Sequence, residues 1–255
     1  MMGMTRALRK RGVLSVVAVG FFSLACDANS SGSTATSAGV TGGDESGDGG
    51  TTAGMVELDA ANMVDDLEDG DDAIIEQNER GGSWFLYNDE TTDATQMPDP
   101  NGSFVPTEGG PDGSGFYAMT SGSGFAEWGA GMGFDFQNDG VTKTPYDASE
   151  FTGIAFHAKG NVSLRVNLMT NAILDETLGG ACVPEGGDTG DCGDGHGVDV
   201  DLTDSWTQYQ IPFDSVTQAG WGVAADFNPA EIISMHFQVA QGQDFEIGID
   251  NIGLY

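Results

Sequence analysis

The feature that most constrains this chain is a series of short segments in which apolar and polar residues alternate. Each is bounded by Gly, Asp or Pro, and alternation with a period of two is typical of a strand with one buried face. Only NPAEII at 228–233 is expected to form a helical turn. The expected strands lie within residues 62–68, 83–88, 115–120, 125–136, 153–159, 163–170, 207–213, 233–240 and 244–255. Many short strands separated by turns predict an all-β fold, a β-sandwich of the jelly-roll type that occupies residues 55–255 as one domain.

The chain begins with the features of a targeting segment. Residues 1–26 combine a basic start with the apolar run VLSVVAVGFFSLA, which is too short to span a bilayer comfortably. The sequence SLAC resembles the bacterial lipobox, in which a small residue precedes a Cys that becomes lipidated. Ser23 departs from that pattern, because the lipobox usually has Leu there. We expect a lipoprotein signal peptide that ends at a lipidated Cys26, with ordinary secretion as the alternative.

Gly, Ser and Thr dominate residues 27–54, where apolar residues show no periodicity. Such a segment cannot bury enough apolar surface to offset its chain entropy, so we expect a flexible tether. A lipid on Cys26 followed by this tether would hold a folded domain away from a membrane. The expected location is the bacterial cell envelope or surface, with the N-terminal lipid as the contact to the membrane.

The charge of the chain after Cys26 is strongly negative. All 40 Asp and Glu residues lie beyond Cys26, against four Lys and Arg, which gives a net charge of −36. Repulsion on this scale favours solubility and argues against nucleic acid or an anionic membrane surface as a partner. It makes divalent cations plausible ligands.

The cysteines fit an oxidising compartment. Cys182 and Cys192 flank the polar stretch VPEGGDTGD, and we expect a disulfide between them, which leaves Cys26 for lipidation. Closing a loop of this size stabilises a fold by ~2.5–3 kcal/mol in the chain-entropy model. The alternative is a metal site, but neither a further Cys nor clustered His completes a zinc set with these two residues.

Three of the expected strands carry an unusual set of polar residues. If the strands at 153–159, 163–170 and 233–240 share a sheet, their polar faces form one surface. Its members would be His157, Lys159, Arg165, Asn167, His236 and Gln238. The planar side chains of Arg, Asn, Gln and His offer fixed donors and acceptors to sugar hydroxyl groups. The alternative is that any half-exposed strand alternates in this way.

The four Trp residues differ in their sequence neighbours. Trp84 and Trp221 are close to Gly, so we expect either of them to lie at the rim of a groove, with Trp84 as a candidate ligand contact. Trp128 and Trp206 are expected in the core or at its edge, which is the commoner role for a Trp.

Carboxylates are too numerous to identify a catalytic pair, and the sequence has no nucleophile elbow, P-loop or HExxH motif. Two acidic regions are candidates for a metal. DDLEDGDD at 65–72 would approach Asp250 if the first and last strands pair, and such oxygen ligands suit Ca²⁺. The segment 186–195 (GGDTGDCGDG) does not match an EF-hand loop, so a solvated acidic loop is expected there. Plain surface acidity is the alternative for the first region as well.

Several segments occur in the same order as in galactose-binding-like jelly rolls. They are VDDLEDGD, ERGGSWFLYND, YDASEFTGIAFHAKG, LTDSWTQYQIPF, QAGWG and IGIDNIGLY. Within that group, residues 62–255 most closely resemble carbohydrate-binding modules of family 11. This resemblance implies a β-sandwich with a structural calcium near the chain ends and binding of β-glucan chains on a concave sheet. The chain lacks the row of Tyr that stacks on sugar rings in that family.

The resemblance also implies roles for particular residues. It makes Glu68 and Asp250 the preferred calcium ligands, followed by Asp66 and Asp69. It makes candidate glycan contacts of His157, Arg165, Asn167, His236 and Gln238. We therefore expect a monomeric, non-catalytic, calcium-stabilised lipoprotein that binds a polysaccharide. The alternatives are a structural or protein-binding surface lipoprotein and, less favoured, a glycoside hydrolase.

Overall fold

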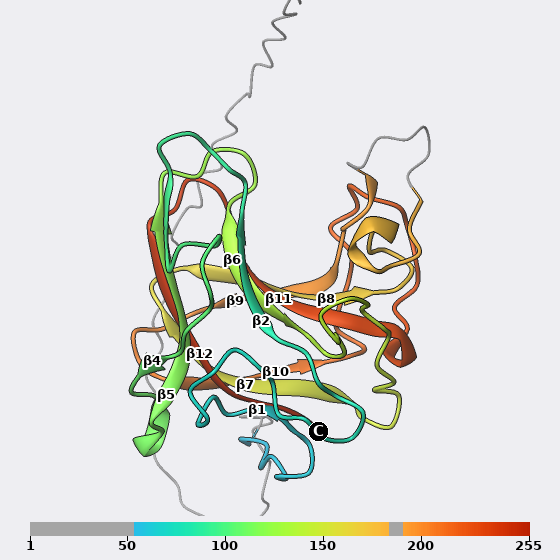
Figure 1. Cartoon of the computed structure of the whole chain (residues 1–255), viewed down its shortest axis with the longest axis horizontal. Coiled ribbons are helices and arrows are strands. Elements are labelled where there is room, and N and C mark those ends of the chain that lie inside the picture. The colour runs from blue at the N-terminus through green and yellow to red at the C-terminus, as the bar shows by residue number, and fades with distance from the viewer. Residues whose placement is uncertain (1–53, 184–190) are drawn as a thin grey trace, which may run out of the picture. The chain divides into compact units, whose positions relative to one another are not determined.

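The computed structural model describes residues 54–183 and 191–255, and it is a sandwich of two antiparallel sheets (Figure 1). The predicted all-β fold is therefore confirmed. The predicted signal peptide, Cys26 and nearly all of the predicted tether lie outside the described residues. Within the described part of the chain, no helix is long and apolar enough to cross a membrane.

The strands match the alternating segments closely. They are β1 (Met63–Asp65), β2 (Trp84–Asn88), β3 (Thr95–Met97), β4 (Thr107–Glu108), β5 (Phe116–Ser123), β6 (Ala130–Asp135), β7 (Gly153–Gly160), β8 (Ser163–Thr170), β9 (His196–Asp201), β10 (Thr207–Pro212), β11 (Ile232–Val239) and β12 (Phe245–Leu254). The short strands β3 and β4 and the strand β9 were not anticipated. The turn predicted at NPAEII is the 3-10 helix η4 (Pro229–Glu231); two other 3-10 turns are η1 (Pro111–Gly113) and η2 (Glu176–Leu178).

The two sheets divide the strands in a non-sequential order. One sheet has the order β10-β7-β12-β5-β3, with β1 paired to β12 and β4 paired to β5. The other has the order β2-β6-β11-β8-β9. Every pairing between named strands is antiparallel. Consecutive strands such as β7 and β8 therefore lie in different sheets, as expected of a jelly roll.

The core lies between the inner faces of the two sheets. Phe156 of β7 and Phe237 of β11 are both fully buried and meet edge to face, with ring centroids 5.1 Å apart. Trp84 belongs to the same core: it is only 3 % exposed and stacks on Phe104 at 5.5 Å. The prediction that Trp84 contacts a ligand at a groove rim is therefore wrong. The physical reason is that Trp84 begins β2 and faces inward, where its indole N–H donates to Asp65 at 2.6 Å.

Alternate glycines in β6 allow close packing on the outer face of its sheet. A Cβ atom on Gly131 would lie 2.3 Å from the carbonyl oxygen of Phe237 and 2.7 Å from the hydroxyl of Tyr87. A Cβ atom on Gly133 would lie 2.4 Å from the carbonyl oxygen of Met235. The absence of a side chain at these glycines therefore lets the β11 backbone and aromatic rings from β2 approach β6 closely. Glycine within a strand often occurs where another group packs this closely.

Replacing Gly131 with Ala should destabilise the fold. The added methyl group would collide with main-chain atoms of β11 that cannot move independently, and overpacking of this kind costs about 1–3 kcal/mol of unfolding free energy. Urea denaturation measures this change. Gly81→Ala is the matched control, because its Cβ would meet nothing closer than 3.7 Å. Equal stability of the Gly131→Ala variant and the parent protein would contradict the packing described for β6.

Candidate functional site

Two rows of paired residues cross the outer face of the five-stranded sheet. The first row consists of Tyr87, Gly131, Gln238, Arg165 and Asp199, one from each strand. Residues that are directly paired in a sheet point to the same face. The predicted neighbours Arg165 and Gln238 are therefore brought together on this face.

The second row runs beside the first and completes the polar surface. It consists of Phe85, Gly133, His236, Asn167 and Gly197. Asn167 donates to the side-chain oxygen of Gln238 at 3.4 Å, which links the two rows. Four of the residues predicted from the polar faces, from β8 and β11, thus lie on one surface.

The other two predicted members of this surface, His157 and Lys159, lie elsewhere, and the prediction for His157 is wrong. His157 is on β7 in the other sheet, where it is paired with Gln208 and Asp250. The strands at 153–159 and 163–170 are consecutive, but the chain crosses from one sheet to the other between them. Lys159 follows His157 into that sheet and lies over the rings of Tyr117 and Trp206.

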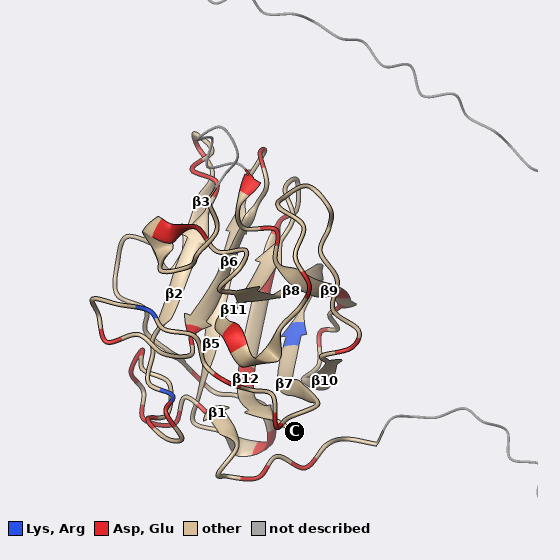
Figure 2. Cartoon of the chain, turned by 90° about the vertical axis from the view of Figure 1, so that its right-hand side faces the viewer, with Lys and Arg blue, Asp and Glu red and all other residues tan. Residues whose placement is uncertain are grey.

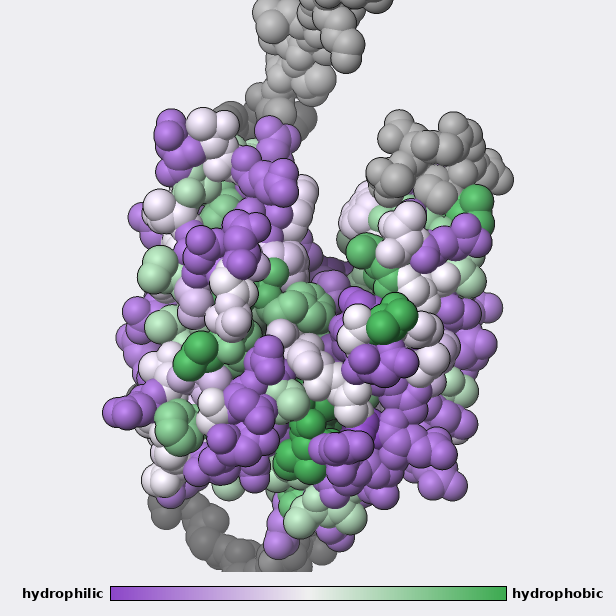
Figure 3. All heavy atoms as spheres, in the orientation of Figure 1, coloured by the Kyte–Doolittle hydropathy of each residue, from purple (hydrophilic) through white to green (hydrophobic). Residues whose placement is uncertain are grey.

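The polar surface forms the floor of a groove of about 720 Å³. Figure 1 shows the five-stranded sheet beneath an opening between two raised groups of loops, and Figure 3 shows the hollow between them. Aromatic and aliphatic side chains line the walls, with Tyr87 and Trp128 on the β2 side and Leu174, Leu178 and Trp221 beyond β8. A largely apolar cleft of this size with a few placed polar groups is typical of a ligand site.

Trp128 contributes to the wall of this groove instead of the core. Its side chain is 44 % exposed, and its ring stacks on Tyr87 with centroids 5.9 Å apart. The expectation of a Trp128 in the core or at its edge fails because β6 begins only at Ala130 and Gly129 has a φ of 112°. Trp221, which we expected at a rim, is 58 % exposed and lines the groove.

Arg165 is the basic residue that lines the groove in the described part of the chain, and nearby groups compensate its charge. Its guanidinium lies 3.6 Å from the Asp199 carboxylate and donates to the carbonyl oxygen of Thr217 at 2.8 Å. Figure 2 shows how few basic residues the fold has among many acidic ones. The scarce cation therefore joins the floor strands β8 and β9 to the loop after β10.

The remaining floor groups are neutral hydrogen-bonding groups. Burial, with a smaller effect of Lys143, lowers the pKa of His236 to about 3, so its imidazole is uncharged at neutral pH. Its Nε2 lies 2.9 Å from the hydroxyl of Ser234. The hydroxyl of Tyr87 and the side-chain oxygen of Asn167 are buried and have no partner among the described residues. Such unsatisfied polar atoms are rare in proteins and are often completed by water or a ligand.

The predicted disulfide is confirmed and fastens the far wall of the groove. Cys182 and Cys192 are bonded to each other. The main chain on either side is held to the segment after β8, because Cys182 donates to Leu174 and Gly193 donates to Ile173. Leu174 and Gly193 both line the groove. The cross-link thus restrains the loops that carry the wall.

A Cys182→Ser, Cys192→Ser double variant should lose about 2–3 kcal/mol of unfolding free energy, since the open chain gains loop entropy. Its wall should also become more sensitive to proteolysis near residue 180. Urea denaturation and limited proteolysis, each with and without a reducing agent, provide the measurements. The reductant should shift the parent protein to the behaviour of the double variant and leave the variant unchanged. If full reduction changed neither the unfolding free energy nor the proteolysis of the parent protein, this role of the disulfide would be contradicted.

A second polar cluster lies near the chain ends. The hydroxyl oxygen of Ser114 is 2.6 Å from Glu68, 2.8 Å from Asp250 and 3.0 Å from the carbonyl oxygen of Phe116. Burial raises the pKa of Asp250 to about 7, with Glu68 and Asp66 adding to the shift and the Ser114 hydrogen bond opposing it. The hydrogen bond from Ser114 lowers the pKa of Glu68. The structure therefore brings the two preferred calcium ligands to one hydroxyl group.

The other two candidate calcium ligands contribute less directly. Asp66 and Asp69 each accept a hydrogen bond from the main chain two residues ahead, at 3.3 Å. Asp66 is near enough to raise the pKa of Asp250. Among residues 54–183 and 191–255, no group of three His, Cys, Asp or Glu side chains is arranged to hold a metal ion.

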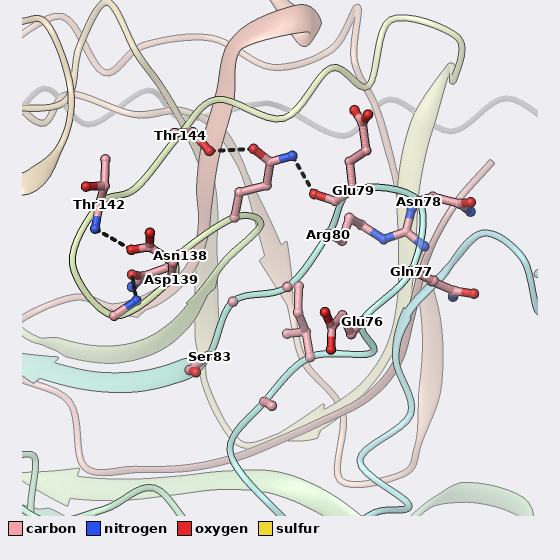
Figure 4. Close-up of a pocket in the computed structure, with 16 residues that line it drawn as sticks. Glu76, Gln77, Asn78, Glu79, Arg80, Ser83, Asn138, Asp139, Thr142 and Thr144 are labelled. Atoms are coloured by element: carbon pink, nitrogen blue, oxygen red, sulfur yellow. Dashed lines mark hydrogen bonds between the residues drawn. The ribbon is translucent and has the colours of Figure 1, made fainter.

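A wider hollow of about 820 Å³ lies between residues 73–83 and 137–144, as Figure 4 shows. Its polar groups mostly bond to one another: Gln137 donates to the carbonyl oxygen of Glu79 and accepts from Thr144. The guanidinium of Arg80 is buried and donates to Tyr146 and to the carbonyl oxygen of Met63. No aromatic side chain lines this hollow. The groove over β8 and β11 is the better candidate site.

No protein-family model matches this chain, and no curated protein matches it. Solved structures with a similar fold include carbohydrate-binding modules. One is the family 11 module from Clostridium thermocellum in complex with a β-1,3-1,4-mixed-linked tetrasaccharide, at 19 % identity, with 76 % of this chain and 94 % of that chain covered and a TM-score of 0.46. Another is the family 11 module of the cellulosomal cellulase Lic26A-Cel5E of the same organism, at 18 % identity, 75 % and 92 % coverage and a TM-score of 0.45. A third is a family 30 module, at 10 % identity, 75 % and 85 % coverage and a TM-score of 0.46. At these values the similarity concerns the fold, and the ligand has to be inferred from the groove itself.

Proposed function

We propose that this protein binds a neutral polysaccharide in the groove over β8 and β11 without catalysing its cleavage. The observation that carries the proposal is the pairing of Arg165 with Gln238 and of Asn167 with His236 beneath two walls that each carry a Trp. Sugar rings have apolar faces and a rim of hydroxyl groups. A floor of planar polar groups between aromatic walls is complementary to both.

Unsatisfied groups in the groove support a hydroxyl-bearing ligand. The hydroxyl of Tyr87 can donate and accept, while the side-chain oxygen of Asn167 can accept. Both atoms are buried and without a protein partner among the described residues. A sugar hydroxyl that reached them would remove the desolvation cost of leaving each polar atom unpaired, about 1–3 kcal/mol per group.

The charges of the groove favour an uncharged ligand. Asp199 compensates Arg165, and the neutral form of His236 adds no positive charge. The chain after Cys26 has a net charge of −36, so an anionic polysaccharide would approach against long-range repulsion. A neutral glycan does not experience this repulsion.

The carboxylates of the groove support binding instead of hydrolysis. A glycosidase of the usual kind needs two carboxyl groups on either side of the scissile bond. Of the described residues that line the groove, Asp199 is engaged by Arg165 and Asp194 accepts hydrogen bonds from main-chain N–H groups. Neither is disposed as a free acid or nucleophile.

A calcium ion near the chain ends is part of the proposal. The Ser114 hydroxyl has one proton, but three acceptor oxygens lie within 3.0 Å of it. A cation between Glu68 and Asp250 would relieve this excess of acceptors, with the carbonyl oxygen of Phe116 as a further hard ligand. Bound there, it would join the segment after β1 to β12. Asp66 would act at longer range, and Asp69 has no direct role.

The proposal also includes display of the domain on a bacterial cell envelope through a lipid on Cys26. It is supported by the basic start, the apolar run and the SLAC sequence of residues 1–26. Residues 27–54 would then separate the groove from the membrane. A polysaccharide in the surroundings of the cell would be the natural ligand.

Arg165→Ala and Gln238→Ala should each weaken glycan binding by about tenfold or more, because each removes a hydrogen-bonding group from the floor. The measurement is a glycan array of neutral and uronic-acid polysaccharides, followed by calorimetry on the glycans that bind. His157→Ala is the matched control, since His157 lies in the other sheet. A blank array for the parent protein would favour a structural or protein-binding role, and equal loss in all three variants would refute the assignment of the groove.

Removal of calcium with EDTA should lower the melting temperature, because the ion offsets the repulsion between Glu68 and Asp250. Added Ca²⁺ should restore the original midpoint. Glu68→Gln should reduce this response, whereas Asp69→Asn should leave it intact. Melting curves followed by circular dichroism give the comparison. A midpoint that is the same in EDTA and in millimolar Ca²⁺ would dispose of the calcium proposal.

A further inference from the structure

Each exposed Trp of the groove belongs to a loop whose main-chain N–H groups converge on one carboxylate. In the loop before β6, the N–H groups of Glu127, Trp128 and Gly129 all donate to Oδ2 of Asp89, at 2.9, 3.0 and 2.9 Å. The other oxygen of Asp89 accepts from the N–H of Thr91 at 3.0 Å. Asp89 directly follows β2, so it ties the Trp128 loop to the edge of the sheet.

The opposite wall repeats the arrangement with unrelated residues. Oδ2 of Asp194 accepts from Gly220 at 2.7 Å, from Trp221 at 3.0 Å and from Gly222 at 3.2 Å. Its Oδ1 accepts from Ala219 at 3.0 Å. Asp194 is only 2 % exposed and lies just before β9, the other edge strand of this sheet.

These anchors are strong relative to ordinary loop contacts. Hydrogen bonds from N–H groups to a carboxylate are about twice as strong as bonds between neutral groups. Burial acts to raise the pKa of Asp89, but hydrogen bonds from Thr91 and the loop hold it well below its usual range. Each loop is therefore tied to its carboxylate by several main-chain hydrogen bonds, and each presents a large apolar ring to solvent.

Rigid presentation of exposed indoles has a consequence for binding. The part of a Trp ring that faces solvent gains nothing for folding, but burying it against a ligand is favourable. A prearranged ring also loses little conformational entropy when the ligand arrives. Because the two loops follow or precede opposite edge strands of the floor, the rings would flank a ligand on both sides of the paired rows.

We propose that Trp128 and Trp221 form a prearranged clamp that stacks on apolar faces of a sugar chain from the two walls, and that Asp89 and Asp194 are its positioning residues. The clamp rests on the proposed function, since it needs a glycan in the groove. It goes beyond the polar floor by assigning much of the affinity to two rings and to the carboxylates that hold their loops.

The first test removes the rings, using the neutral polysaccharides that bind on the array. Trp128→Ala and Trp221→Ala should each lower affinity by about tenfold or more. The melting temperature should stay nearly constant for Trp221→Ala and fall slightly for Trp128→Ala, which loses the stacking on Tyr87. Trp206→Ala is the control, since Trp206 packs against Tyr117 and Lys159 in the other sheet. Full affinity in either of the first two variants would overturn the clamp.

The second test is a double-mutant cycle that separates positioning from general stability. Asp89→Ala should weaken binding in the parent protein but have no further effect in the Trp128→Ala background, because the carboxylate acts through that ring. Crossing Asp89→Ala with Trp221→Ala should give additive losses. The same pattern with the partners exchanged is expected for Asp194. Additivity in the matched pairs would show that the carboxylates do not position the rings.

A ligand-free measurement covers variants that fold poorly. Two proteins are compared, one that keeps only Trp128 and one that keeps only Trp221 among the groove indoles, and in both the fluorescence anisotropy of the indole should decay slowly. Asp89→Asn should speed the decay for Trp128 alone, and Asp194→Asn should speed it for Trp221 alone. Fast decay in the parent protein would overturn the anchoring. A parent protein that binds no glycan but holds both indoles rigid would refute the proposed function, whereas glycan binding that ignores both rings would refute only the clamp.

Discussion

The hydrogen-bonded register between β8 and β11 determines what the groove can do. It places Arg165 opposite Gln238 and Asn167 opposite His236, and the flanking strands extend both rows across all five strands. Side chains alternate between faces, so a slip of one residue would turn these polar groups into the core. Leu164, Val166 and Leu168 on the inner face are fully buried and resist such a slip. The hydrophobic core thus fixes the positions of the polar side chains on the floor of the groove.

Sequence patterns were sufficient to predict the fold and part of the site. Period-two alternation identified nine of the strands, because half-buried strands must alternate in this way. The same alternation placed Arg165 and Asn167 on one face, and likewise His236 and Gln238. The pairing of Cys182 with Cys192 followed from their number and spacing.

The remaining features depend on contacts that alternation does not encode. His157 has the same local pattern as Arg165, but only the strand order reveals that β7 and β8 belong to different sheets. Trp84 and Trp128 exchanged their expected roles, because one begins an inward-facing strand and the other precedes a glycine of positive φ. Asp89 and Asp194 look like ordinary surface acids in a chain with 40 Asp and Glu. Only the hydrogen bonds that they accept from main-chain N–H groups reveal that they hold the Trp128 and Trp221 loops.

The groove therefore combines a polar floor set by strand register, walls held by a disulfide and by the carboxylates of Asp89 and Asp194, and two exposed indole rings. Nuclear magnetic resonance of the labelled domain, titrated with a neutral oligosaccharide, tests this account most directly. The indole signals of Trp128 and Trp221 and the side-chain amides of Asn167 and Gln238 should shift together and saturate at one ligand concentration. Shifts centred on His157 and the seven-stranded sheet, with those four signals unmoved, would contradict it.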